Sequence, residues 1–168
     1  MDKFLPGFHL LSPKIRRKVG WSAIVVALLI VVLPMIVFAS TGPACGGGYP
    51  EKWCKAKLDT IVDNWGMYNR ECVGYTAYRV AASGRTMPYG FGDANKWPVA
   101  AHAHGIPVDD KPRAGDVAVR FEGKHGHSMY VESINSDGTL NVSQYNTHKT
   151  GTYSEARVSP YGLAFIHF

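Results

Sequence analysis

The apolar residues of this chain change their spacing near Val108, and this change constrains the fold more than any other sequence feature. Before Val108, apolar side chains recur every three or four residues, as on one face of a helix. After it they alternate with polar ones, as in a strand that has one buried face. Helices followed by antiparallel strands predict an α+β domain in which the helices pack on one sheet.

The same patterns give the expected bounds of each element. Helices are predicted over residues 51–64, 72–83 and 94–104. Asn69 precedes the second helix and is of a type that caps a first turn. Strands are predicted over residues 117–121, 127–134, 140–146, 152–158 and 164–168. The Asn-Ser-Asp-Gly sequence at 135–138 is typical of a hairpin turn, so the second and third strands should pair antiparallel.

Most of the excess positive charge lies near the N-terminus. Residues 1–39 hold five of the 18 Lys and Arg residues and one of the 13 acids, so the formal charge of +5 falls to +1 beyond them. A nearly neutral body argues against a nucleic-acid partner. The uncharged segment 21–39 has 19 residues, about enough to cross a bilayer. Its basic flank at 14–18 predicts a cytoplasmic N-terminus and an outer C-terminal domain.

Two interpretations of this segment compete. A cleaved signal peptide is consistent with the Val37-Phe38-Ala39 triplet and with Pro34 before it. An uncleaved transmembrane anchor is favoured, because the apolar run is longer than the core of most signal peptides. The predicted organisation is a cytoplasmic basic leader at 1–20, an anchor or signal segment at 21–39, a linker at 40–50 and a catalytic domain at 51–168. The domain would be membrane-bound outside the cytoplasm, or extracellular if the leader is cleaved.

The three cysteines fit an oxidising compartment. Cys45 and Cys54 flank a glycine-rich loop that could close into a disulfide, and the alternative is that both are free. Cys72 is left over, as a reactive thiol would be.

Cys72 at a predicted helix start and His127 at a predicted strand start form a candidate catalytic pair. The histidine can take the thiol proton and the helix amides favour the thiolate, so a thiolate–imidazolium pair is expected at neutral pH. The thiolate would attack a carbonyl group, with the Cys72 N–H as an oxyanion donor. The alternative is that Cys72 is a small buried apolar residue and His127 a hydrogen-bonded strand residue.

A third residue should orient the imidazole. Gln144 and Asn146 lie on the predicted neighbouring strand and face the same side, so either amide oxygen could accept from the second ring nitrogen. No cofactor or metal site is predicted. His102, His104 and His125 occur without a zinc-binding motif, and no acidic calcium loop is present in the sequence.

Five segments in order carry a family resemblance: Cys72-Val73-Gly74-Tyr75, residues 92–97, residues 112–118, residues 126–132 and Val142-Ser143-Gln144-Tyr145-Asn146. From residue 69 to 168 the chain resembles the CHAP (cysteine, histidine-dependent amidohydrolase/peptidase) family of bacterial cell-wall hydrolases. The resemblance implies a papain-like α+β fold, with Cys72 as nucleophile and His127 as general base. The family's third polar residue, often Glu, falls on Gln144, and the following Asn falls on Asn146.

The expected function is therefore hydrolysis of an amide bond in peptidoglycan through an acyl-enzyme. The enzyme would be an N-acetylmuramoyl-L-alanine amidase or an endopeptidase, a cysteine peptidase in the second case. The alternative is a non-catalytic cell-wall-binding or scaffold module of an envelope machine for secretion, conjugation or division. Expected partners are peptidoglycan, the membrane through the N-terminal segment, and such an envelope protein complex.

Overall fold

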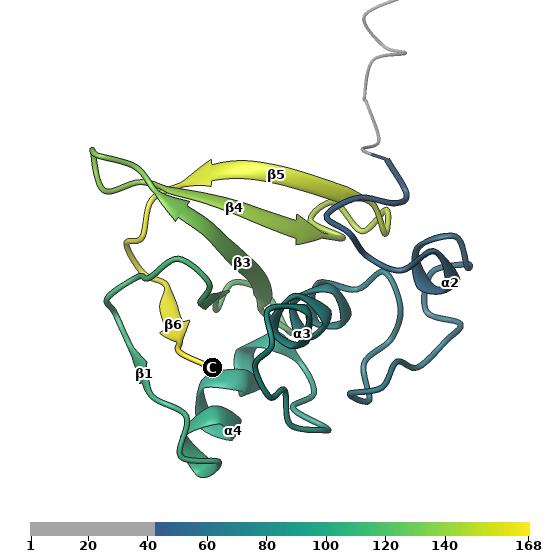
Figure 1. Ribbon diagram of the computed structural model, residues 1–168, viewed down its shortest axis with the longest axis horizontal. Helices are drawn as coiled ribbons and strands as arrows, with labels where there is room; N and C mark the ends of the chain where they lie inside the picture. The colour runs from purple at the N-terminus through teal and green to yellow at the C-terminus, as the bar shows by residue number, and fades with distance from the viewer. Residues whose placement is uncertain (1–42) are drawn as a thin grey trace, which may run out of the picture. The chain divides into compact units, whose positions relative to one another are not determined.

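A computed structural model describes residues 43–168, in which helices pack against one antiparallel sheet (Figure 1). The predicted leader and the anchor or signal segment at 21–39 lie outside the described residues. None of the helices within 43–168 has the length and apolar character needed to cross a membrane. The helices are α2 (Glu51–Cys54), α3 (Cys72–Ala82), a 3-10 turn (Ala94–Lys96) and α4 (Trp97–Ala103).

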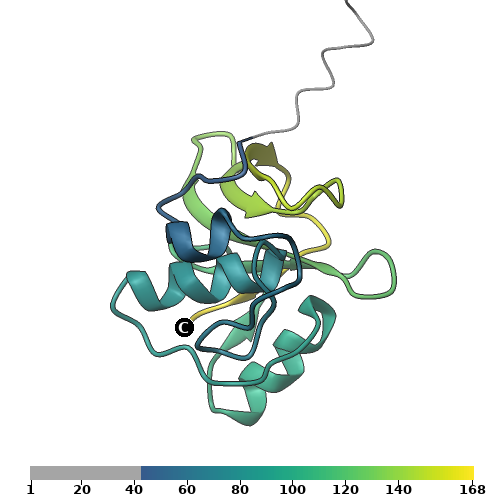
Figure 2. The same ribbon diagram turned by 90° about the vertical axis from the view of Figure 1, so that its right-hand side faces the viewer.

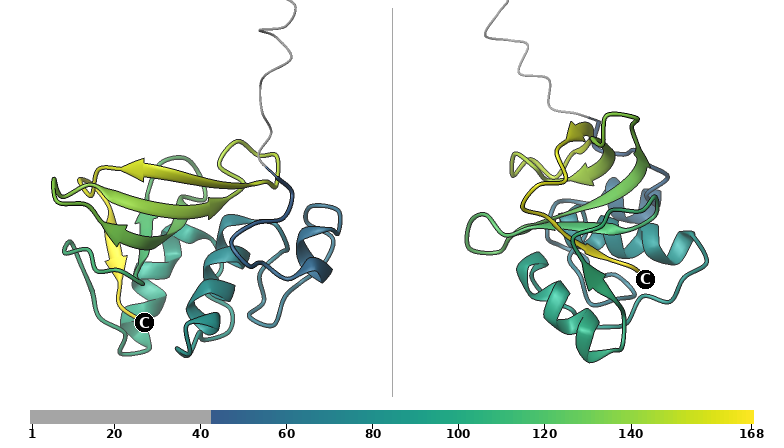
Figure 3. Two further views of the ribbon diagram at one scale, coloured as in Figure 1. Left: turned by 45° about the horizontal axis from the view of Figure 1, so that its top comes forward. Right: turned by 90° about the vertical axis from the view of Figure 1, so that its left-hand side faces the viewer.

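The sheet has six strands in the order β1-β6-β2-β3-β4-β5, and every neighbouring pair is antiparallel. The strands are β1 (Val108–Asp109), β2 (Val117–Arg120), β3 (His127–Ile134), β4 (Leu140–Tyr145), β5 (Tyr153–Val158) and β6 (Ala164–Ile166). The sheet is strongly twisted, so that β4 and β5 run across the direction of β6 (Figure 3). Right-handed strand twist accounts for this shape.

Helix α3 lies against β3 and β4, as two views at right angles show (Figures 1 and 2). Its buried residues Ala77 and Val80 pack in a core with Trp97, Val117 and Ile166. Two buried hydroxyl contacts cross the same interface, at 2.9 Å between Thr76 Oγ1 and Ser128 Oγ and 2.8 Å from Tyr75 Oη to Ser143 Oγ. Unmade buried hydrogen bonds are costly, so these contacts fix how far the helix lies along the strands.

The predicted helix over 51–64 is wrong, because α2 ends at Cys54. The loop that follows is organised by the side chain of Asn69. Its Oδ1 accepts from the amides of Thr60 and Ile61, and its Nδ2 donates to the carbonyls of Trp53 and Lys57. These four contacts replace the backbone bonds that a continuous helix would have made.

Asn69 therefore does not cap α3. The capping position belongs to Glu71, which makes no side-chain capping bond. The short strand β1 was not predicted, since two residues give no periodic pattern. Strand β3 has the predicted bounds, and the other predicted strands are one to two residues longer than observed. Cys45 and Cys54 are joined in a disulfide, which ties the start of the domain to the end of α2.

We expect Asn69→Ala to lower the free energy of unfolding by about 2–4 kcal/mol, because buried amides and carbonyls of the 53–61 loop lose their partner. Asn64→Ala is the matched control, since Asn64 is exposed and should change stability by less than about 0.5 kcal/mol. Urea unfolding of both variants measures the difference. Equal stability of the two variants would show that the loop does not depend on Asn69.

Candidate active site

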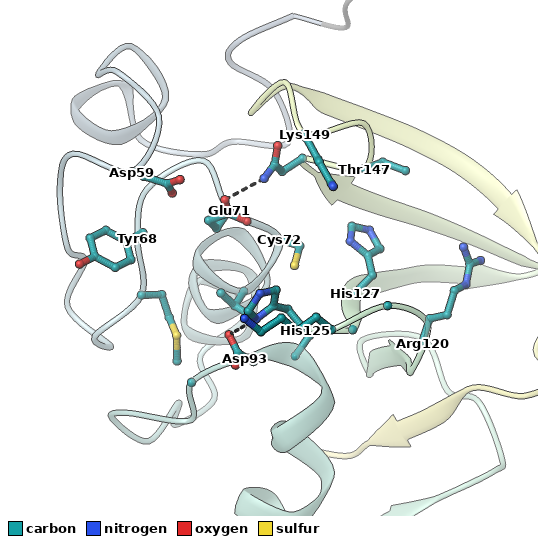
Figure 4. A pocket seen from close by; sticks show the side chains of 18 of the residues that line it. Asp59, Tyr68, Glu71, Cys72, Asp93, Arg120, His125, His127, Thr147 and Lys149 are labelled. Carbon is teal, nitrogen blue, oxygen red and sulfur yellow. Dashed lines mark hydrogen bonds and ion pairs between the residues drawn. The ribbon is translucent and has the colours of Figure 1, made fainter.

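An open pocket of about 1220 Å³ lies where the start of α3 meets the ends of β3 and β4. Figure 4 shows the Cys72 sulfur and the His127 ring projecting into it from α3 and β3. Its walls include the 58–73 segment, the 92–94 turn, the β2–β3 loop and the β4–β5 turn. The structure thus brings the predicted nucleophile and base to one pocket, although the two residues are 55 positions apart in the sequence.

Cys72 is the first residue of α3 and only 8% of its surface is exposed. Burial raises the pKa of its thiol. Hydrogen bonds from the backbone and hydroxyl of Ser128 oppose that shift, and the carboxylate of Glu71 adds to it. Ser128 follows His127 on β3 and is fully buried, so its contacts with the Cys72 thiol are shielded from solvent.

The His127 ring is oriented by Gln144. The distance between His127 Nε2 and Gln144 Oε1 is 2.9 Å, and Gln144 itself is buried in β4. An amide oxygen only accepts, so Nε2 carries the hydrogen and Nδ1 of the neutral ring keeps a free lone pair. Burial lowers the pKa of His127, the Gln144 contact raises it, and the positive charge of Arg120 lowers it further.

Desolvation works against the expected thiolate–imidazolium pair. Burial raises the pKa of the Cys72 thiol and lowers the pKa of the His127 ring, and both shifts favour a neutral thiol beside a neutral imidazole. The sequence-based prediction rested on the histidine as proton acceptor and on the helix amides, and it took no account of desolvation.

Asn146 has a different task from Gln144. Its Nδ2 donates to Glu71 Oε1 at 2.8 Å and its Oδ1 accepts from the Gly151 amide at 2.7 Å. Among residues 43–168, the side chain that bonds the His127 ring is Gln144. Asn146 instead links Glu71, the residue before Cys72, to the β4–β5 turn. Of the two candidates, the contacts favour Gln144 as the residue that orients His127.

Three charged residues of the pocket were missed by sequence reasoning. Glu71 and Asp59 lie on the helix side, where burial raises the pKa of Glu71 and its contact with Asp59 raises it further. Arg120 lies at the end of β2, directly paired in register with His127. The predicted strand bounds contained the signal for Arg120, since pairing the 117–121 strand with the 127–134 strand places it beside His127.

The remaining histidines have other surroundings. His125 lies on the pocket rim and contacts Asp93, with 3.1 Å between Nδ1 and Oδ1. His102 and His104 are exposed residues of the α4 end and do not line the pocket. Within the described part of the chain, no group of three or more His, Cys, Asp or Glu side chains has a metal-binding arrangement.

The domain has helices packed on an antiparallel sheet, and the Cys72 thiol and the His127 imidazole line one pocket. The sequence resemblance implied this kind of fold and this kind of site. The family model of the CHAP domain matches residues 62–146, just over half of the chain. The chain belongs to the CHAP domain family. Cys72, His127, Gln144 and Asn146 all fall inside the matched segment.

Relatives of known name agree with this assignment. The N-acetylmuramoyl-L-alanine amidase sle1 of Staphylococcus aureus strain USA300 is 35% identical over 82 residues, which cover 49% of this chain and 23% of that protein. The protein of the same name from bovine strain RF122 / ET3-1 matches over the same shares. The matched region thus spans less than a quarter of these relatives.

The fold has a counterpart among solved structures. A crystal structure of an N-acetylmuramoyl-L-alanine amidase from Staphylococcus aureus superposes with a TM-score of 0.58 at 23% identity, covering 71% of this chain and 36% of that one. At this identity the likeness concerns the fold alone.

We expect Glu71→Gln to make Cys72 easier to ionise. A glutamine at this position keeps an oxygen for Asn146 Nδ2 but removes the negative charge that raises the thiol pKa. The rate of iodoacetamide alkylation plotted against pH should therefore shift to lower pH. Asp110→Asn, which removes an exposed charge outside the pocket, should leave the curve in place. A shift of the same size in both variants would rule out a local effect of Glu71.

Proposed function

We propose that this domain hydrolyses an amide bond of peptidoglycan through a cysteine nucleophile. The observation that carries the proposal is the bond between His127 Nε2 and Gln144 Oε1, which leaves Nδ1 free to accept a proton in the pocket that Cys72 shares. Membership of the CHAP family and the amidase names of the relatives support peptidoglycan as the substrate. The bond cut would be either the muramoyl–L-alanine amide or a peptide bond of the stem or cross-bridge.

The reaction follows from these groups. His127 Nδ1 takes the Cys72 proton as Sγ attacks the substrate carbonyl carbon, and a C–S bond forms. Charge on the carbonyl oxygen is stabilised by the Cys72 backbone N–H at the α3 start. His127 then gives its proton to the leaving nitrogen as the C–N bond breaks. Water, deprotonated by the same ring, hydrolyses the thioester and restores the thiol.

The proposed location is the outer side of the cell membrane, with the 21–39 segment as anchor, or the extracellular space if that segment is cleaved. The disulfide between Cys45 and Cys54 supports an oxidising compartment, since such bonds are rare in reducing cytosol. Peptidoglycan lies in the same compartment, so substrate and domain would meet there.

One observation favours a second candidate, a wall-binding or scaffold module without activity. Burial raises the pKa of Cys72 and lowers that of His127, which disfavours the reactive ion pair in the resting protein. An inert buried thiol would react with iodoacetamide at neutral pH no faster than a free cysteine with its pKa near 8.5.

Cys72→Ala should reduce the release of fragments from purified cell walls by at least about a thousandfold, because a methyl group cannot attack the carbonyl carbon to form the acyl intermediate. His127→Ala should give a similar loss. His102→Ala, an exposed histidine outside the pocket, serves as the control and should keep full activity. Fragments are quantified by mass spectrometry. Undiminished release by Cys72→Ala would move the nucleophile to another residue.

Gln144→Glu should preserve or raise activity. A carboxylate 2.9 Å from the ring would favour the imidazolium and raise the pKa of His127, which promotes proton transfer from Cys72. We expect alkylation of Cys72 at neutral pH to accelerate by up to about tenfold. Asn141→Asp adds the same charge to an exposed position of β4 and should change little. A large loss of activity in Gln144→Glu, with the fold intact, would give Gln144 a different task.

A further inference from the structure

The sheet-side rim of the pocket carries positive charges that no acid neutralises. Arg120, Lys124 and Lys149 all line the pocket, and none of them forms an ion pair within residues 43–168. The loop after β2 also contributes the acid Glu122 to the pocket lining. Elsewhere on the surface, cations such as Arg157 and Lys96 do have acidic partners.

Arg120 is the rim cation closest to the reaction. It pairs directly with His127 across β2 and β3, and side chains of directly opposed residues project from the same face with Cβ atoms roughly 5 Å apart. In the view of Figure 4 the His127 ring lies between the Cys72 sulfur and the Arg120 side chain. Arg120 is therefore next to the base, on the side away from the nucleophile.

An unpaired cation in this position works against catalysis in the free protein. After burial, which is the larger cause, the charge of Arg120 also lowers the pKa of His127, and it opposes the imidazolium that the reaction requires. An anion that binds Arg120 would remove this opposition. A guanidinium presents a planar fork of donors that matches a carboxylate with two parallel hydrogen bonds.

We propose that Arg120 binds a free carboxylate on the leaving-group side of the substrate. The inference rests on the proposed function, in which His127 gives its proton to the leaving nitrogen, so that the leaving group must lie beside His127. The substrate class is then an amide whose released amine belongs to a peptide with a free carboxylate near the scissile bond. Lys124, in the loop that follows Arg120, adds attraction for the same acidic portion. Asp59 and Glu71, on the opposite wall, would repel it.

In this proposal the substrate supplies the negative charge that offsets the positive charge of Arg120. Before binding, Arg120 disfavours the charged ring. Once a carboxylate occupies the guanidinium, the imidazolium becomes easier to form and the thiol proton can be transferred. A carboxamide in place of the carboxylate would still accept a hydrogen bond but would leave the positive charge in place.

The test compares two synthetic muropeptides that differ only in a carboxylate or a carboxamide beside the scissile amide on its leaving-group side. We expect the wild-type protein to cleave the carboxylate form with a kcat/KM about tenfold higher, because charged hydrogen bonds are about twice as strong as neutral ones. In Arg120→Gln the ratio should fall to about one, and in Arg120→Lys it should lie between the two. Lys111→Gln removes an exposed cation outside the pocket and should keep the wild-type ratio.

A second readout separates recognition from a merely structural role. In Arg120→Gln the acid limb of the kcat/KM profile should move to higher pH. The ring loses a cation that lowers its pKa, so it is already protonated at a higher pH and cannot take the thiol proton. Thermal unfolding of the variant confirms that it is folded.

Equal cleavage of both substrates by the wild type would overturn the inference, as would a tenfold ratio that survives in Arg120→Gln. An equal loss on both substrates in that variant, without a shift of the acid limb, would also overturn it. These results differ from failure of the proposed function itself, in which the wild-type protein cleaves neither muropeptide and releases nothing from purified walls.

Discussion

The site depends on the hydrogen bonds that attach α3 to the sheet. Thr76 lies one helical turn after Cys72, Ser128 follows His127, and their hydroxyls meet at 2.9 Å with both residues fully buried. Thr76 Oγ1 also contacts the Cys72 and Val73 carbonyls of its own helix, so a slide of α3 along β3 would cost chiefly the Ser128 hydroxyl its contact with Thr76, at about 1–3 kcal/mol if that buried group found no other partner. The contact between Tyr75 and Ser143 adds a second anchor on β4. These polar contacts hold α3 at one position along the strands, and at this position the Cys72 sulfur and the His127 imidazole line the same pocket.

The local pattern of apolar residues predicted the elements whose apolar side chains pack in the core. Strand β3 buries the consecutive residues 128–131 and helix α3 buries most of the face toward the sheet, and their starts at His127 and Cys72 are those predicted from the sequence. The segment 55–71 could not be predicted in this way. Its apolar residues have helical spacing, but a single buried side chain, Asn69, binds four backbone groups that lie eight to sixteen residues before it. Nothing local identifies such a partner.

The site residues that belong to sequence motifs could be predicted. The residues that reach the site only through the folding of distant segments could not. Alternation along the strand placed Gln144 and Asn146 on one face, and the ambiguity between them is resolved only by backbone geometry. Strand β4 ends at Tyr145, and Asn146 has a left-handed φ of 60°, so it no longer follows the alternation. Its side chain turns to Glu71 instead. Glu71 and Arg120 carry no motif, and their importance arises from what lies next to them in space.

Glu71 and Arg120 act on the two halves of the same proton transfer. The anion of Glu71 stands beside the thiol and opposes the thiolate, while the cation of Arg120 stands beside the ring and opposes the imidazolium. Burial works in the same direction on both groups. Burial and both charges therefore favour the neutral pair over the ion pair, and a neutral thiol is a poor nucleophile. In the proposed reaction, a substrate carboxylate bound to Arg120 would bring the negative charge that makes charge separation favourable. Recognition of the substrate and activation of the thiol would then depend on the same electrostatic interaction.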